Sequence, residues 1–200
     1  WLYKGIAKLE GNPRTVFGGQ YLMRDNPSWL EKYWVLTNSR EQIYQTTLVG
    51  GCIFISRKTF IEMKGFNSTL NSGEDSDLTH RLINSNYIVK IDPQLSVIHL
   101  GYPSEVIPFI KRQIWHSSDY ITNIKAAIKD KIFLLTLIFM SGVLSSFLHV
   151  LLTQEISILA ASAVFLSPTV LSYKRVSRSK FRIQSAIDWI SIYLVDVLYL

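Results

Sequence analysis

Hydrophobic residues dominate the last third of the chain, where polar positions are few. The run from Ile132 to Leu152 is nearly continuous and matches the ~20 apolar residues that a helix needs to cross a bilayer. Similar runs cover 156–173 and, incompletely, 186–200. The first two runs are so close that they predict a helical hairpin, within which Pro168 is tolerable. We therefore predict transmembrane helices over about 132–152, 156–173 and 186–200.

The first hundred residues alternate short helical and extended patterns, which is typical of an α/β domain. We expect helices up to Leu9, over 58–64 and from about residue 72, with strands from Thr15, after Gly50-Gly51, and over 87–91 and 95–100. Ser72 is a good N-cap for the third helix, and Asp75 three residues later can complete a capping box. Gly65 suits the left-handed position that ends a helix.

Aromatic residues gather on another predicted helix, at Trp29, Tyr33 and Trp34. Core packing is the default interpretation of such a cluster, and sugar stacking is the alternative. Two acids in the last apolar run, Asp188 and Asp196, are eight positions apart and so lie near one helical face. We expect both to be buried against partner helices rather than to act in catalysis.

Residues 105–130 predict an amphipathic helix. Isoleucines recur there at spacings of three, four and seven, while Lys111, Arg112 and Gln113 occupy other faces. Because Trp115 and these basic residues come just before the first apolar run, we expect the helix to lie in the headgroup layer of a membrane. The alternative is a helix packed against the preceding domain.

Basic residues give the chain a net charge of +6 and cluster beside the apolar runs, at Lys125, Lys129 and Lys131 and again over 174–182. The predicted hairpin puts both clusters on one side of the membrane, and the positive-inside rule makes that side cytoplasmic. This placement explains the basic excess better than nucleic-acid binding does. The single Cys52 permits no internal disulfide.

Three carboxylates gather at the predicted helix start near residue 72, at Glu74, Asp75 and Asp77. A carboxylate held there can accept a proton from a hydroxyl group. The structural alternative is that acids in a first turn simply interact favourably with the helix macrodipole.

The motifs around these acids resemble the second half of the catalytic domain of family 2 glycosyltransferases, over roughly residues 1–120. They are Gly50-Gly51 before a strand, Gly65-Phe66, the Glu74-Asp75 pair, Asp92-Pro93 and His99. The resemblance implies the C-terminal half of a GT-A domain, an inverting mechanism and a nucleotide-activated sugar as donor. It makes Asp75 the catalytic base, with Glu74 beside it.

The resemblance also implies substrate-binding residues. Gly50, Gly51, Asp77 and Trp115 would contact the acceptor or another part of the substrate. For Asp77 the alternative is a salt bridge with Arg81, four residues further along the helix.

A divalent metal, Mn²⁺ or Mg²⁺, is the cofactor that the resemblance implies. The family's metal-binding Asp-x-Asp motif is absent, so we expect the chain to be a fragment that starts within the catalytic domain. His99 would supply one imidazole ligand and the main ligands would precede residue 1. The alternative for His99 is an ordinary hydrogen-bonded histidine.

Departures from the family pattern bear on the reaction. Lys64 and Asn67 flank Gly65-Phe66 where the family usually has Gly-Gly-Phe-Asp, which loosens the match on the acceptor side. Membrane polysaccharide synthases of the family carry Gln/Arg-x-x-Arg-Trp, and Ile114 replaces the second arginine before Trp115. Single-sugar transfer is therefore favoured over polymerisation.

The sequence thus predicts a membrane-bound, cytosol-facing glycosyltransferase that moves one sugar from a nucleotide-sugar donor to a lipid-linked or growing glycan acceptor. The expected parts are a partial GT-A domain over 1–104, an interfacial helix region over 105–130 and transmembrane helices over 131–200. The alternatives are a processive polysaccharide synthase and a non-catalytic membrane scaffold with a glycosyltransferase fold.

Overall fold

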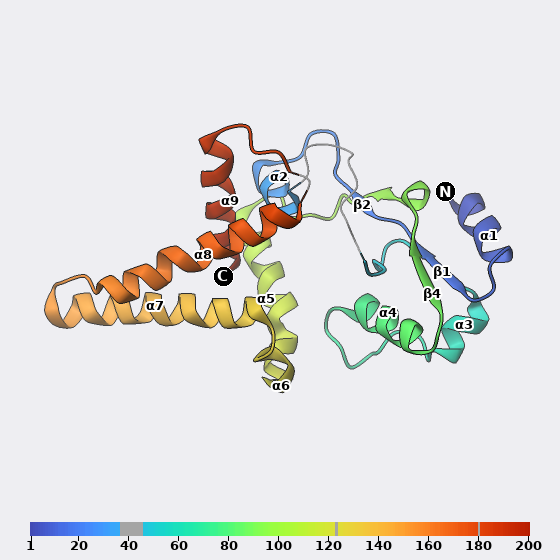
Figure 1. Cartoon of the computed structure of the whole chain (residues 1–200), viewed down its shortest axis with the longest axis horizontal. Coiled ribbons are helices and arrows are strands. Elements are labelled where there is room, and N and C mark those ends of the chain that lie inside the picture. The colour runs from blue at the N-terminus through green and yellow to red at the C-terminus, as the bar shows by residue number, and fades with distance from the viewer. Residues whose placement is uncertain (37–45, 123, 180) are drawn as a thin grey trace. The chain divides into compact units, whose positions relative to one another are not determined.

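The computed structural model describes residues 1–36, 46–122, 124–179 and 181–200. The chain divides into two compact units, one formed by Trp1–Pro27 with Ser39–Tyr102 and the other by Ser28–Asn38 with Pro103–Leu200. The first unit is a mixed α/β structure with two small sheets, and the second is helical (Figure 1).

The first unit is built around a short three-stranded sheet with the order β3-β1-β4. β1 pairs in parallel with β4 and antiparallel with β3, and a second parallel pair joins β2 to β5. The elements are α1 (Leu2–Glu10), β1 (Thr15–Gly18), β2 (Tyr21–Leu22), β3 (Ile53–Phe54), α3 (Arg57–Glu62), α4 (Glu74–Asn84), β4 (Ile88–Ile91), the 3-10 turn η1 (Pro93–Leu95) and β5 (Val97–Ile98).

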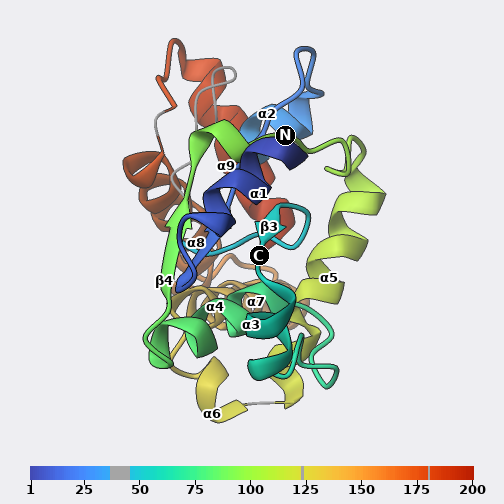
Figure 2. The same cartoon turned by 90° about the vertical axis from the view of Figure 1, so that its right-hand side faces the viewer.

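Successive side chains of β1 point to opposite faces of the sheet, and both faces are apolar. Each face is therefore covered by a helix. Phe17 packs in a cluster with Phe54 and Leu95 on the side of α1, which lies beside β3 in Figure 2. Val16 packs with Leu78 and Leu82 of α4 on the other side. The alternation of hydrophobic residues therefore produces a layered α/β unit.

The start of α4 differs from the prediction. Its N-cap is Gly73, which has a left-handed φ of 75°, and no side chain caps the helix. The predicted cap at Ser72 with a capping box from Asp75 is therefore wrong, because the glycine turns the chain one residue later. Gly65 does adopt the left-handed φ expected after α3, at 66°.

The second unit contains a helical hairpin, as the apolar runs predicted. Its elements are α2 (Trp29–Val35), α5 (Val106–Thr122), α6 (Ile124–Ala127), α7 (Lys131–Thr153), α8 (Ile158–Arg178) and α9 (Ala186–Tyr199). α7 and α8 lie side by side in Figure 1. They approach closely at Gly142, where a Cβ atom would lie 2.9 Å from that of Ala163. Pro168 is accommodated inside α8.

Among the described residues, α7 alone is long and apolar enough to cross a membrane, and only 11% of its most apolar stretch is buried. This is weak evidence for membrane association. α8 carries Lys174, Arg175 and Arg178 in its last turns, and α9 has 14 residues. The predicted spans at 156–173 and 186–200 therefore form helices but are not confirmed as spans. Lys180 of the second basic cluster, and the side chain of Lys125 in the first, lie outside the described part of the chain.

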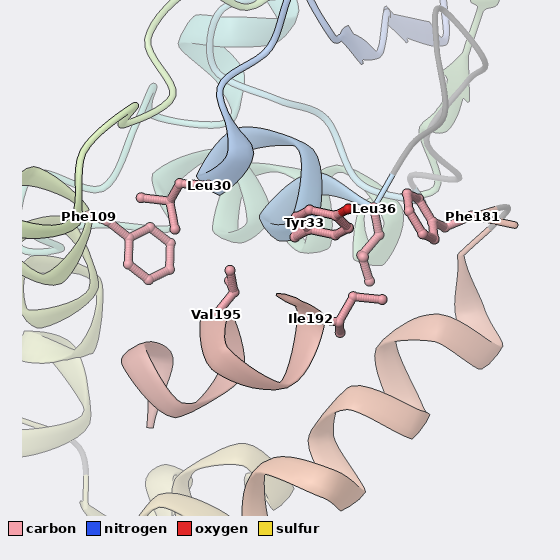
Figure 3. Close-up of a cluster of buried hydrophobic side chains, with 7 residues drawn as sticks. All are labelled: Leu30, Tyr33, Leu36, Phe109, Phe181, Ile192 and Val195. Carbon is pink, nitrogen blue, oxygen red and sulfur yellow. The ribbon is translucent and has the colours of Figure 1, made fainter. Parts of the chain in front are cut away.

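The core of the second unit joins α2 to residues far along the sequence. Leu30, Tyr33 and Leu36 face Ile192 and Val195 of α9, with Phe109 and Phe181 closing the cluster on either side (Figure 3). The predicted core role of the aromatic cluster on α2 is confirmed for Tyr33, which is 6% exposed.

Both acids of α9 are buried, as expected. Asp188 accepts a hydrogen bond from the Tyr33 hydroxyl at 2.8 Å, and Asp196 is paired with Arg175 of α8 and hydrogen-bonded by Ser172 at 2.7 Å. Polar pairs that join α9 to α2 and to α8 therefore hold the second unit together, in addition to its apolar cluster.

Candidate active site

Asp75 lies in the first turn of α4, where backbone amides hold its half-buried carboxylate. The Gly50 N–H donates to Oδ2 at 3.0 Å, and the Ser76 N–H donates to Oδ1 at 2.7 Å. Thr79, one turn later, donates from its hydroxyl to the Asp75 carbonyl at 2.7 Å and accepts the Leu48 N–H at 3.1 Å. The segment before β3 is thus attached to α4 at two points, which fixes the carboxylate relative to the glycine pair.

The glycine pair allows its neighbours to come close. A Cβ atom at Gly50 would lie 3.6 Å from Oε1 of Glu74, so Glu74 and Asp75 both border this loop. A Cβ atom at Gly51 would lie 2.6 Å from the hydroxyl oxygen of Tyr21. That oxygen accepts the Gly51 N–H at 2.8 Å. A side chain at residue 51 would therefore displace Tyr21.

Tyr21 connects the glycine pair to His99. The ring centroids of Tyr21 and His99 are 4.3 Å apart. The ring of Tyr102 also contacts His99, with 4.4 Å between the two centroids. Gly101 permits this arrangement, because a Cβ atom there would lie 3.0 Å from Cε1 of His99. The imidazole is thus held between two tyrosine rings.

Five of the predicted site residues are therefore linked within the first unit: Glu74, Asp75, Gly50, Gly51 and His99. The N–H groups of Gly50 and Gly51 are neighbours along the backbone, and they donate to Oδ2 of Asp75 and to the Tyr21 hydroxyl oxygen. Because one backbone unit separates the two N–H groups, these two oxygens are at most about 10 Å apart. Tyr21 was missed in the sequence, since an aromatic residue after a strand is usually core. The nearby glycines were the available signal.

Asp77 and Trp115 are placed differently. Asp77 accepts a hydrogen bond from Nε of Arg81 at 2.8 Å and forms an ion pair with its Nη2 at 2.7 Å. Arg81 also donates to the carbonyls of Met63 and Gly65. This geometry agrees with the salt bridge expected as the alternative role and ties α4 to the end of α3. Trp115 is 51% exposed on α5 and belongs to the other unit. Substrate binding by either residue stays a prediction.

Cys52 directly follows the glycine pair, and its thiol is fully buried. Its Sγ donates to the Leu95 carbonyl at 2.8 Å. Burial raises the pKa of the Cys52 thiol above its usual value, so the neutral form is favoured. A buried, protonated thiol is a poor nucleophile, so Cys52 is a poor candidate for a reactive group.

The implied divalent cation finds few ligands here. Within the described ranges, no three His, Cys, Asp or Glu side chains come together as a metal site would require. His99 could supply one imidazole ligand, but the described residues do not by themselves fit a metal centre. His99 as a ligand remains a prediction.

Residues 33–100 match a family model described as the N-terminal domain of galactosyltransferase. The match covers less than half of the chain, but it includes the glycine pair, Asp75 and His99. The comparisons with curated proteins and with solved structures give no match. The match indicates a glycosyltransferase-like domain, and such domains in general bind a nucleotide-sugar donor and an acceptor.

Proposed function

We propose that the chain is part of an inverting glycosyltransferase of the family 2, GT-A type. On this proposal it moves a single sugar from a nucleotide-sugar donor to a lipid-linked or growing glycan acceptor. The observation that carries the proposal is the hydrogen bond between Gly50 and Asp75, since it holds a carboxylate at the edge of a glycine loop inside the matched region.

Asp75 would act as the general base. As the acceptor hydroxyl attacks the anomeric carbon, a new C–O bond forms, the bond to the diphosphate breaks, and the hydroxyl proton passes to Asp75. One such displacement inverts the anomeric centre. Glu74 borders the same loop and would contribute to substrate binding or to the local charge.

Other protein groups would position the substrate. Gly50 lets the backbone approach the two carboxylates, and Gly51 lets the Tyr21 hydroxyl approach the loop. Asp77 and Trp115 remain candidates for acceptor contacts. A divalent Mn²⁺ or Mg²⁺ is part of the proposal with His99 as one ligand, and its other ligands would come from substrate or from outside the described residues.

Membrane attachment through α7 completes the proposal. Its apolar side chains are exposed over most of its length, which suits contact with lipid. We place the catalytic unit on the cytoplasmic side because basic residues flank the apolar helices. A lipid-linked acceptor would then meet the active site from the bilayer.

Release of nucleoside diphosphate from a panel of nucleotide sugars, with membranes carrying the full-length protein, tests this function. Asp75→Asn should reduce turnover at least ~100-fold, the low end of what a general base contributes. Glu62→Gln is the matched control, because Glu62 is an exposed carboxylate of the same unit that accepts a hydrogen bond from the Tyr87 hydroxyl at 2.8 Å.

Equal turnover in Asp75→Asn and the control would refute the assignment of the base. No turnover with any donor would favour the scaffold alternative. The length of the product is a separate measurement, and long polymer chains would favour a processive synthase over single-sugar transfer.

A further inference from the structure

The helical unit contains a small, fairly enclosed cavity of about 210 Å³ between α5, the first turns of α7 and the end of α9. These three elements meet near the C-terminus in Figure 1. The lining includes Gln113, His116 and Ser117 of α5, Phe133 and Thr136 of α7, and Tyr199 of α9. None of these residues takes part in the proposed reaction.

The lining offers hydrogen-bond donors on α5 and α9. The hydroxyls of Ser117 and Thr136 already donate to backbone carbonyls one turn earlier, so their oxygens offer lone pairs only. Donors to a ligand would come from the amide of Gln113 and the hydroxyl of Tyr199. Tyr199 is held in place by its ring contact with Trp34, at 4.9 Å between centroids.

A positive charge lies at the cavity. The Arg112 Nε–H donates to Nε2 of His116 at 3.2 Å, which places the guanidinium beside a lining residue. In sequence, the lining residues are flanked by the cations Lys111, Arg112, Lys129 and Lys131 and by the acids Asp119 and Asp130. The Asp130 carboxylate already accepts the N–H groups of Ile132 and Phe133, as the N-cap of α7. The surroundings therefore favour an anionic ligand.

The cavity also lies at the polar end of the most apolar helix. After Lys131, α7 contains no Asp, Glu, Lys or Arg up to its last residue, Thr153. If α7 enters a bilayer, its first turns lie where lipid headgroups are, and basic pockets beside such helices are suited to anionic headgroups.

We propose that this cavity binds the phosphate headgroup of a membrane lipid. Gln113 and Tyr199 donate hydrogen bonds to the phosphate oxygens, Arg112 supplies the countercharge, and Phe133 lies toward the acyl chains. This inference rests on the proposed membrane association of α7 but not on sugar transfer. The phosphate can belong to an ordinary phospholipid or to a prenyl-phosphate acceptor.

Native mass spectrometry of the full-length protein, purified in detergent and titrated with single lipids, tests the inference. Phosphatidylglycerol and a prenyl phosphate are compared with diacylglycerol, which lacks the phosphate. Arg112→Gln and Gln113→Leu should each weaken binding of the phosphate-bearing lipid about tenfold or more, as expected for loss of a hydrogen bond to a charged group. Arg178→Gln is the matched control, since it removes one exposed positive charge elsewhere in the same unit.

Preferential binding of phosphatidylglycerol identifies bulk phospholipid as the source, and preferential binding of the prenyl phosphate identifies the acceptor. The inference is overturned if diacylglycerol binds equally well, or if both cavity variants bind like Arg178→Gln. Because the readout is lipid binding, a protein that fails to transfer sugar can still confirm the cavity. Conversely, loss of lipid selectivity leaves the Asp75 experiment unaffected.

Discussion

Arg175 on α8 joins the end of α2 to a buried acid of α9. Its guanidinium pairs with Asp196, which is 0% exposed, and donates to the backbone carbonyls of Tyr33, at 3.0 Å, and Trp34. It also lies over the Trp34 ring, 4.7 Å from the centroid. One side chain thus neutralises a buried acid and satisfies two carbonyls at the end of α2.

Arg175→Met keeps much of the apolar stem but removes the charge and its hydrogen bonds. Asp196 would then lose its countercharge and keep the hydrogen bond from Ser172. Removing one partner of a buried pair costs about 3–5 kcal/mol, a large share of the ~5–15 kcal/mol that stabilises a typical domain. We expect the free energy of unfolding to fall by this amount.

Denaturant unfolding of the full-length protein in one detergent, followed by tryptophan fluorescence, measures this loss. Arg178→Met is the matched control, because Arg178 is exposed on the same helix, and it should change stability by less than ~0.5 kcal/mol. The double variant Arg175→Met/Asp196→Leu should recover most of the loss, since replacing a whole buried pair by apolar residues is often neutral. If Arg175→Met were as mild as Arg178→Met, the buried-pair reasoning would be refuted.

Two further predictions concern the first unit. Gly51→Ala places a methyl carbon 2.6 Å from the Tyr21 hydroxyl oxygen, so it should displace the loop and lower turnover at least ~10-fold. Gly50→Ala should disturb the loop less, because its methyl carbon would lie 3.6 Å from the nearest atom, Oε1 of Glu74. Equal effects of the two variants on turnover would contradict this reasoning. Burial raises the pKa of Asp92, but hydrogen bonds from Lys8, 2.6 Å away, and from the backbone outweigh it and hold the pKa below the usual 3.8. The contribution of Asp92 to stability is therefore present above pH 3.8 and lost as the pH falls below it. Asp92→Asn should be less stable than the native protein by about 1 kcal/mol at pH 7, and thermal unfolding should show that difference shrinking in acid.

Local signals in the sequence predicted much of the fold. The period of the isoleucines predicted α5, the apolar runs predicted the hairpin of α7 and α8, and Gly65 marked the end of α3. The two-residue strand β5 was predicted too long, at 95–100, since its ends depend on pairing with β2 elsewhere in the chain. The N-cap at Gly73 was missed because a left-handed glycine can replace a side-chain cap, which the spacing of Ser72 and Asp75 does not reveal.

The candidate site was predictable only as a set of residue types. The resemblance named Asp75 and the glycine pair, but their hydrogen bond joins residues 25 positions apart, and the bond from Gly51 to Tyr21 spans 30. Contacts at such separations leave no periodic pattern. For the same reason, the glycines near Tyr21 do not reveal which distant residues its ring and hydroxyl contact.

The placement of α2 follows from burial that no local pattern encodes. The chain passes between the two units three times, because Ser28–Asn38 belongs to the helical unit while the residues on both sides belong to the other. Leu30 and Tyr33 are buried by side chains of α5 and α9, beyond residue 104. A chain cut at the predicted boundary of 104 would expose this apolar face and leave the α2 carbonyls without Arg175, so the first unit and α2 cannot be separated from the helices without cost. The helices of the second unit therefore contribute to the stability of a segment that lies, in sequence, between the strands of the first unit.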